Sequence, residues 1–384
     1  MTQLKKVVAI NGNEAAAEAM RQCRPDVVAE YPITPQTIIV ETFSQYVADG
    51  KSDAEIISVE SEHSAISATI GAQAAGARAM TATSSQGLAL MFESMVVAPG
   101  LRLPILMHVV NRALSAPINI HCDHSDSMMI RDCGWMQLYS ETAQEVYDNT
   151  FLALRVAEDN NLPIMVCQDG FIVSHCVERV EILDDETITK FVGEYNPERY
   201  LLNTDDPYTC GPLCLADSYF EVKKEQSDAM LKVKQSFIRN GKELSKITGR
   251  KYDVIDTYNL EKAKHVIVVI SSTASVVRSV IDKLKNDDYG LLRINLFRPF
   301  PYEEVKAALA NAENVAVLDR AMSYGANAPL YGEVLSSLYG SNVNVQSYVF
   351  GLGGRDIFEK DIENVFRELS SGKLGGFKYI GVKR

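Results

Sequence analysis

Short apolar runs alternate with helix-forming segments through residues 1–170, and this alternation limits the folds open to the chain. The runs cover residues 7–10, 26–31, 56–59, 78–83, 105–110 and 162–167, and the segments between them are rich in Ala, Ser, Glu and Gln. Strands that alternate with helices of this length are typical of a parallel, doubly wound sheet. Because several of these runs are nearly continuously apolar, we expect helices on both faces of that sheet and an α/β fold class.

A polar or turn-forming block follows each of four runs. The blocks are Tyr31-Pro32-Ile33-Thr34-Pro35, Glu60-Ser61-Glu62-His63-Ser64-Ala65, Thr83-Ser84-Ser85-Gln86-Gly87-Leu88 and Asn111-Arg112-Ala113-Leu114-Ser115-Ala116-Pro117. Groups just past the ends of parallel strands line a common crevice. One site is therefore expected to gather a hydroxyl, a carboxylate, an amide and a guanidinium. That set suits a small keto acid and a cofactor that needs a proton relay.

Charge and hydropathy exclude several classes of protein. The formal net charge is -12, which leaves no basic excess to neutralise nucleic-acid phosphates. No run approaches the roughly 18 apolar residues that a membrane helix needs, and the run at 7–10 is too short for a secretory leader. We therefore expect a cytoplasmic protein with no nucleic-acid and no membrane partner.

The seven cysteines are scattered and odd in number, which indicates reduced thiols in a protein expected to be cytoplasmic. The two closest in the sequence, Cys210 and Cys214, have no third or fourth cysteine nearby. Iron–sulfur clusters need closely spaced cysteines, so we expect this chain to carry no cluster of its own.

The second half predicts a linker and a smaller α/β unit. Residues 178–208 are acidic and look irregular, whereas residues 218–244 have apolar positions at helical spacing and predict an exposed helix that bridges two domains. Strand-like and helix-like segments alternate again from about residue 265. We place the two domains at residues 1–245 and 246–384, with a surface tail after residue 370.

Seven sequence blocks, in this order and at this spacing, are specific to one group of enzymes. They are YPITPQT at Tyr31–Thr37, ESEHSAISATIGAQAAGAR at Glu60–Arg78, TSSQGLALM at Thr83–Met91, NRALSAPINI at Asn111–Ile120, RDCGWMQLY at Arg131–Tyr139, FRPFP at Phe297–Pro301 and GLGGRD at Gly351–Asp356. On these residues the chain resembles, nearly end to end, the α subunits of the 2-oxoacid:ferredoxin oxidoreductases, and most closely the multi-subunit pyruvate type.

The resemblance implies a pyrimidine-type thiamine diphosphate-binding domain followed by a smaller transketolase C-terminal-like domain. It implies that this chain holds the aminopyrimidine ring of thiamine diphosphate while a β subunit binds the diphosphate through Mg²⁺. The other implied partners are γ and δ subunits, [4Fe-4S] clusters on partner subunits, CoA and ferredoxin. A diphosphate site of this class reads GDG followed by an Asn pair. Here Gln168-Asp169-Gly170 has no matching Asn pair downstream, as expected of an α subunit.

Glu62 is the predicted catalytic and cofactor-binding residue. By resemblance, its carboxylate bonds N1′ of the aminopyrimidine and favours the imino tautomer, whose nitrogen removes the C2 proton. The residues alone also allow an acid placed at a helix N-terminus by the helix dipole. Glu60 is the rival carboxylate, but the register of the surrounding residues matches the family's glutamate to Glu62.

Thr34 and Arg112 are the predicted substrate ligands. The resemblance makes Thr34 a donor to a keto or carboxylate oxygen, and the planar guanidinium of Arg112 can clamp a carboxylate with two parallel bonds. The alternatives are a turn threonine that bonds its own backbone and a structural ion pair. Ile33, Ser85 and Gln86 are predicted to contact the cofactor, although Ser85 or Gln86 could instead cap the following helix.

The run from His121 to Asp126 contains several possible metal ligands. No second cluster of ligands accompanies it, so we assign no metal to this chain. In the family this stretch is a loop near the active site and a subunit contact. Trp135, the single tryptophan, is expected in the core or in an interface.

The resemblance predicts the reversible conversion of pyruvate, CoA and oxidised ferredoxin to acetyl-CoA, CO₂ and reduced ferredoxin. Thr34 favours pyruvate or another uncharged 2-oxoacid, but branched-chain and aryl 2-oxoacid enzymes share much of the pattern. Two further hypotheses stay open. One is a lipoamide-linked dehydrogenase or transketolase-like enzyme, and the other is a non-catalytic scaffolding subunit.

Overall fold

The first domain is built on a seven-stranded sheet in a computed structural model that describes residues 5–372 and 374–383. Across the sheet the strands run in the order β12 (Leu296–Arg298), β6 (Met136–Tyr139), β7 (Ile164–Asp169), β5 (Leu106–Asn111), β4 (Ala79–Thr83), β2 (Val27–Glu30) and β3 (Glu55–Ser58). Neighbouring strands are parallel, except that β12 is antiparallel to β6. Strands β4, β5 and β7 are buried at every residue, which explains their largely apolar sequence.

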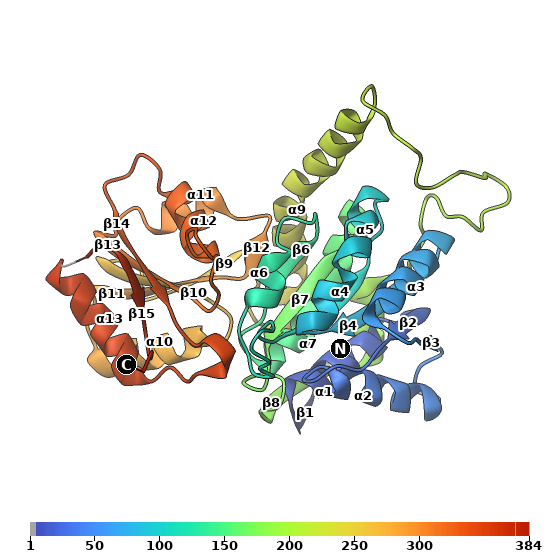
Figure 1. Cartoon of the computed structure of the whole chain (residues 1–384). Helices are drawn as coiled ribbons and strands as arrows, with labels where there is room; N and C mark the ends of the chain where they lie inside the picture. The colour runs from blue at the N-terminus through green and yellow to red at the C-terminus, as the bar shows by residue number, and fades with distance from the viewer. Residues whose placement is uncertain (1–4, 373, 384) are drawn as a thin grey trace.

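Helices cover both faces of this sheet, so the predicted doubly wound α/β arrangement is confirmed (Figure 1). One face packs against α1 (Gly12–Gln22), α2 (Thr37–Ala48), α7 (Ala143–Asn160) and, through α7, α9 (Tyr219–Thr248). The other face carries α3 (Glu62–Ala75), α4 (Ser85–Met95), α5 (Val97–Gly100) and α6 (Ser125–Met129). Trp135 lies in this second core, where its indole nitrogen donates to Met95.

The segment 178–208, predicted to be irregular, begins with regular structure. β8 (Glu178–Leu183) pairs antiparallel with β1 (Lys5–Ile10) in a separate two-stranded sheet. α8 (Asp185–Val192) follows, with the Asp184 carboxylate accepting from the backbone of Thr187. Only Val180 and Leu183 of β8 are buried, so acidic residues mask a strand that composition alone does not reveal. Residues 193–218 then run without helix or strand.

The helix predicted at 218–244 is present as α9, and its first turns, residues 219–228, contain no buried residue. Val233, Phe237 and Leu244 are buried in the core that α9 shares with α7. The prediction of an exposed bridging helix is therefore wrong for the C-terminal half of α9. The apolar residues at helical spacing pack onto the first domain, and the Lys and Glu side chains between them face solvent.

The second domain contains a six-stranded sheet. Its strand order is β15 (Phe377–Tyr379), β14 (Asn344–Val349), β13 (Asn314–Asp319), β10 (His265–Ile270), β11 (Tyr289–Ile294) and β9 (Ile255–Tyr258), with β9 antiparallel to β11. α10 (Thr273–Leu284) and α13 (Glu359–Ser371) cover one face, and α11 (Tyr302–Ala308) and α12 (Pro329–Ser337) cover the other. The tail predicted to lie on the surface thus contributes the edge strand β15.

The two sheets are connected by one strand, β12, that joins the first sheet from the second half of the sequence, and by buried polar contacts. β12 follows β11 in the sequence but joins the first sheet beside β6. The Arg293 guanidinium donates to both carboxylate oxygens of Glu145 at 2.6 and 2.8 Å, and Ser271 Oγ donates to the backbone of Ser140 at 2.9 Å. The apolar core around α4 continues into the second domain. The domains therefore form a fixed pair.

A buried ion pair crosses the same boundary. Asp169 and Arg320 are both buried, with Arg320 Nη1 lying 3.3 Å from Asp169 Oδ2 and His124 Nε2 lying 2.7 Å from Asp169 Oδ1. Burial alone would raise the pKa of Asp169, but the His124 imidazole and the Arg320 guanidinium hold it below its usual range. A depressed carboxyl pKa adds stability above the unfolded-state pKa of about 4, and that stability is lost as pH falls below it.

Replacing Asp169 by Asn is therefore expected to lower the free energy of unfolding of the full chain by about 3–5 kcal/mol at neutral pH, because one charge of a buried pair is left alone. In urea titrations, the wild type should lose this increment when the pH falls below about 4, and D169N should lose less. Asp132→Asn is the control, because Asp132 pairs with Arg298 at an exposed position. Equal stabilities for the two variants would show that the buried pair adds nothing.

None of the helices within residues 5–372 and 374–383 combines the length and the apolar content that crossing a bilayer requires.

Candidate active site

The predicted site residues lie at one edge of the first sheet. Thr34 follows β2, Glu62 opens the helix after β3, Ser85 and Gln86 open the helix after β4, and Arg112 directly follows β5. Since these four strands are parallel, their carboxyl ends meet at the same edge. The structure brings Thr34 into contact with Arg112 and brings Glu62 against the turn that begins at Ser84.

Glu62 is the first residue of α3, where the Ser61 side chain accepts from the backbone of Ser64 and caps the helix. The Glu62 side chain is buried, with 7% of the residue exposed. Its carboxylate makes no hydrogen bond or ion pair with any residue that the structure describes. A buried carboxylate without a partner is costly. The position therefore suits a donor supplied from outside this chain.

Gly87 makes the space beside Glu62. A Cβ at this position would lie 2.7 Å from Glu62 Oε1 and 2.6 Å from Thr83 Oγ1, so no other residue fits without displacing them. The Thr83 hydroxyl is itself buried without a hydrogen-bond partner in the described chain. Sequence reasoning assigned no role to Gly87 or Thr83. The signal for Gly87 was its place in the third block, one residue after Gln86.

Arg112 is held by neutral acceptors. Its Nη1 donates to the backbone carbonyl of Thr34 at 2.9 Å, and its Nε donates to the carbonyl of Asn119 at 3.1 Å. Arg112 forms no ion pair with a residue in the described part of the chain. The alternative that Arg112 serves only a structural ion pair therefore has no partner there. Burial lowers the pKa of the guanidinium, and Asp126 partly offsets this. Nη2 has no hydrogen-bond partner among the described residues, so it is available to donate to a carboxylate.

Side chains from α1 and β7 hold the loop that carries Thr34 in place. Asn13 Nδ2 donates to the Pro35 carbonyl at 2.7 Å, and Gln168 Nε2 donates to Asn13 Oδ1 at 3.0 Å. Gln36 Oε1 accepts from the backbone of Ile33, which is half-buried. The Thr34 residue is exposed, and its hydroxyl has no hydrogen bond within the described ranges. Thr34 is thus oriented by its backbone and keeps its hydroxyl free.

Ser85 and Gln86 join the ends of two strands. The fully buried Ser85 hydroxyl lies 2.6 Å from the Ala113 carbonyl and 2.7 Å from Gln86 Oε1, both of them acceptors. Ser85 has a positive φ of 49°, and the N-cap of α4 is Ser84, whose side chain makes no capping bond. The hydroxyl of Ser85 is therefore occupied by the β5 turn, while Gln86 is half-buried beside it.

The Asp126 carboxylate joins the turns after β4 and β5 at this edge of the sheet. The sequence did not identify it as a site residue. Its buried carboxylate accepts from the backbone nitrogens of Ser85 and Arg112, each at 3.0 Å, and from Asn111 Nδ2 at 2.8 Å. Burial raises the pKa of Asp126 to about 6, against the opposing effect of these hydrogen bonds. The only sequence signal was its place in the acid- and His-rich run, which we weighed for metal binding and, by resemblance, as a loop near the active site.

Two possible metal ligands of that run, Cys122 and His124, lie close to Asp169 of β7. Cys122, His124 and Asp169 bring ligand atoms within 4.8 Å of one another. However, Arg320 Nη1 lies 3.3 Å from Asp169 Oδ2 and 3.6 Å from Cys122 Sγ. Burial also raises the pKa of the Cys122 thiol. A guanidinium thus already lies against two of these three side chains.

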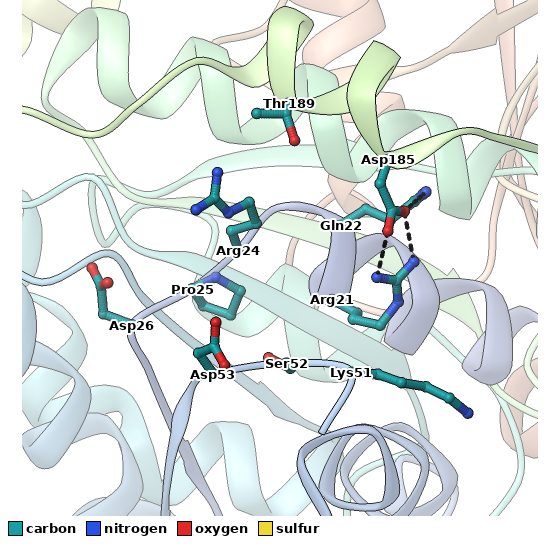
Figure 2. A pocket seen from close by; sticks show the side chains of 10 residues that line it. All are labelled: Arg21, Gln22, Arg24, Pro25, Asp26, Lys51, Ser52, Asp53, Asp185 and Thr189. Atoms are coloured by element: carbon teal, nitrogen blue, oxygen red, sulfur yellow. Dashed lines mark hydrogen bonds and ion pairs between the residues drawn. The ribbon is translucent and has the colours of Figure 1, made fainter. Parts of the chain in front are cut away.

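A surface cavity of about 380 Å³ lies at the opposite edge of the first sheet (Figure 2). Its walls come from the segments that precede β2 and β3, with Asp185 from α8. The lining mixes acidic and basic side chains, and Arg21 already donates to both carboxylate oxygens of Asp185. This cavity is separate from the carboxyl-end site and holds none of the predicted residues.

The fold and the site define a two-domain α/β protein whose first domain has the thiamine diphosphate-binding architecture. Residues 18–239 match the family described as "Pyruvate flavodoxin/ferredoxin oxidoreductase, thiamine diP-bdg". Residues 263–362 match "Pyruvate:ferredoxin oxidoreductase core domain II". The chain belongs to the pyruvate:ferredoxin oxidoreductase family.

Curated relatives extend over the whole length. The chain is 53% identical to the pyruvate synthase subunit PorA of Thermotoga maritima and 46% identical to that of Methanocaldococcus jannaschii, with 100% of each chain covered. It is also 40% identical to the ketoisovalerate oxidoreductase subunit VorA of Pyrococcus horikoshii, over 97% of this chain and 96% of the relative.

Solved structures support the fold. The 2-oxoglutarate:ferredoxin oxidoreductase from Magnetococcus marinus superposes with a TM-score of 0.73 at 19% identity, covering 95% of this chain and 65% of that one. A split-gene transketolase superposes with a TM-score of 0.55 at 11% identity, covering 95% of this chain and 99% of that one. The predicted relation of the fold to transketolase is thus confirmed.

Proposed function

We propose that this chain is the α subunit of a complex that converts pyruvate, CoA and oxidised ferredoxin reversibly to acetyl-CoA, CO₂ and reduced ferredoxin. The single observation that carries the proposal is the unpaired, buried Glu62 carboxylate at the strand edge of a thiamine diphosphate-type domain. Relatives named as pyruvate synthase subunits support the choice of reaction.

The residues present fit the pyrimidine half of thiamine diphosphate. Glu62 offers a carboxylate without a partner, Gly87 leaves the space next to it, and Thr83 has an unused hydroxyl. When bound, thiamine diphosphate would supply an acidic C2 carbon and a ring that accepts the electron pair of the leaving carboxylate. Glu62 would hold a proton at the pyrimidine N1′. We assign Ile33 and Gln86 to the walls around that ring, with the fully buried Ser85 supporting Gln86 from behind.

Arg112 and Thr34 would bind the substrate. Nη2 of Arg112 would bond one oxygen of the substrate carboxylate, and the Thr34 hydroxyl would donate to the keto oxygen. Both groups are held by backbone contacts that leave these atoms free. A guanidinium held between two carbonyls is oriented before the substrate arrives, which reduces the entropy lost on binding.

A second chain must complete the coenzyme site. Asp169, in the segment that resembles a diphosphate motif, is engaged by Arg320 and His124, and Gln168 supports the Thr34 loop. We therefore assign the diphosphate and Mg²⁺ to a β subunit, and the [4Fe-4S] clusters and ferredoxin contacts to partner subunits including γ and δ. Leu90 and Phe92 of α4 are 49% and 43% exposed, and we expect partner chains to cover them. With CoA and ferredoxin as its partners, we place the complex in the cytoplasm.

The choice of 2-oxoacid is tested by a substrate panel on the complex of this chain with its partner subunits. With CoA and a viologen dye as electron acceptor, kcat/KM for pyruvate should exceed that for 2-oxoisovalerate by about 10- to 100-fold, the usual discrimination by pocket size. The VorA relative makes the branched-chain substrate the second candidate. A higher kcat/KM for 2-oxoisovalerate would transfer the assignment to that class.

A further inference from the structure

The loop after β5 closes on itself beside Arg112. The backbone nitrogen of Ala113 donates to the carbonyl of His121 at 3.0 Å, so residues 113–121 form a closed loop. Within it, the Asn119 carbonyl accepts from Arg112 Nε. Both neutral acceptors that orient the guanidinium are therefore loop carbonyls, one in the loop after β2 and one in this closed loop.

The side chain of Asn119 links this loop to the second domain. Its Oδ1 accepts from the backbone of His121 at 2.7 Å, and its Nδ2 donates to the carbonyl of Gly353 at 3.1 Å. One residue thus touches Arg112 through its backbone, its own loop through one side-chain atom, and the second domain through another.

The second domain approaches through a glycine-rich turn, Leu352–Gly354, that follows β14. Gly353 N donates to Asp123 Oδ2 at 3.1 Å, and Gly354 N donates to the Cys122 carbonyl at 2.7 Å. Both glycines have positive φ, +61° and +80°. A Cβ would lie 2.4 Å from Asn119 Nδ2 at the first and 2.3 Å from the His121 Cβ at the second. Only glycine allows this approach.

The position of this turn is set by the rest of the second domain. The backbone of His124 donates to the Arg320 carbonyl at 2.8 Å, and the Arg320 side chain pairs with Asp169. Both ends of the loop are thus anchored, one to β5 and one to the second domain. Hence a displacement of the glycine turn would move the Asn119 carbonyl, and with it the Arg112 guanidinium.

We propose that the second domain sets the substrate affinity of the first, by using the Leu352–Gly354 turn and Asn119 to position the Arg112 guanidinium for the substrate carboxylate. This inference rests on the proposed role of Arg112. Asn119, Gly353 and Gly354 are positioning residues, because none of them needs to touch the substrate. The proposed reaction gives no role to the glycine-rich block of the second domain. In this proposal, that block positions Asn119 and, through it, Arg112.

The first test compares two variants of Asn119 in the assembled complex. Asn119→Asp keeps an acceptor for His121 N but replaces the donor to Gly353 with an oxygen. Both Asn119→Asp and Asn119→Ala should raise KM for pyruvate about tenfold, the loss expected for one hydrogen bond that orients a charged group. Both should leave kcat and KM for CoA within about twofold, because the displaced group acts on the substrate carboxylate alone. A wild-type KM for Asn119→Asp would overturn the link to the second domain.

A second test uses glycines of matched conformation. Gly354→Ala should raise KM for pyruvate about tenfold by displacing the His121 backbone. Gly340→Ala is the control, because Gly340 has a similar φ of +77° and a Cβ there would meet no heavy atom within 4 Å from the described residues beyond its chain neighbours. It imposes the same backbone strain away from the loop and should leave KM unchanged. Equal KM values for the two variants, with equal melting temperatures, would contradict the proposal.

Arg112→Ala separates this inference from the proposed function. If Arg112→Ala raises KM and the Asn119 and Gly354 variants do not, Arg112 binds the substrate without help from the second domain, and only the inference fails. If Arg112→Ala leaves KM for pyruvate unchanged, both the substrate role of Arg112 and the inference that depends on it fail.

Discussion

Replacement of Glu62 by Gln is expected to lower the turnover of the assembled complex by about 10³-fold, the scale of a lost proton-transfer group. The amide keeps the size of the side chain but cannot hold a proton at N1′ as a carboxylate does. Folding should be preserved, because the Glu62 carboxylate makes no bond within the described chain and the helix is capped by Ser61. Dye reduction with saturating pyruvate and CoA measures the loss.

Glu60→Gln is the matched control for this variant. Glu60 lies two residues away and is exposed, and its carboxylate accepts from Ser64 Oγ. That substitution should leave turnover within about twofold of the wild type, as expected for a surface change. Near-normal turnover of Glu62→Gln, or a large loss for Glu60→Gln alone, would refute the assignment of Glu62.

Replacement of Arg112 by Ala should raise KM for pyruvate about 100-fold, because a charged hydrogen bond to the substrate carboxylate contributes roughly 1.5–3 kcal/mol. The change should fall mainly on KM rather than on kcat, since the carboxylate is bound before it is cleaved. Arg112→Lys should recover only part of the affinity, because an ammonium group cannot reproduce the planar fork of donors. Initial-rate kinetics over a wide range of pyruvate concentrations distinguish these outcomes.

Arg102→Ala controls for the loss of an arginine as such. Arg102 also donates to two backbone carbonyls, those of Asn160 and Asn161. It precedes β5, whereas Arg112 follows it, so it lies at the opposite edge of the sheet. Its replacement should leave KM for pyruvate unchanged. A similar rise in KM for both variants would mean that Arg112 acts through stability alone.

The fold and the edge of the site could be predicted because they follow from local sequence. Each of Thr34, Glu62 and Arg112 comes at the end of an apolar run, and parallel strands bring such positions to one edge whatever the details of packing. The order and spacing of the motif blocks also indicated the family to which the chain belongs. β8 was missed because its two buried residues, Val180 and Leu183, are three positions apart in an acidic stretch and give no period-two alternation.

The supports of the site could not be predicted, because they depend on contacts between distant segments. Asn119 meets Gly353 across 234 positions of sequence, and nothing local to either residue marks the other. Asp126 is an acid in a polar run, and its role appears only when the turns after β4 and β5 aim their backbone nitrogens at it. Gly87 is explained only once Glu62 and Thr83 are seen against it.

The most direct test of the account is the rate of hydrogen–deuterium exchange at C2 of thiamine diphosphate bound to the assembled complex, followed by acid quench and NMR without pyruvate. Glu62→Gln should slow this exchange by about 10²- to 10³-fold while the coenzyme stays bound at the wild-type stoichiometry. An exchange rate equal to that of the wild type, with the coenzyme fully bound, would contradict the claim that the Glu62 carboxylate reaches the pyrimidine ring.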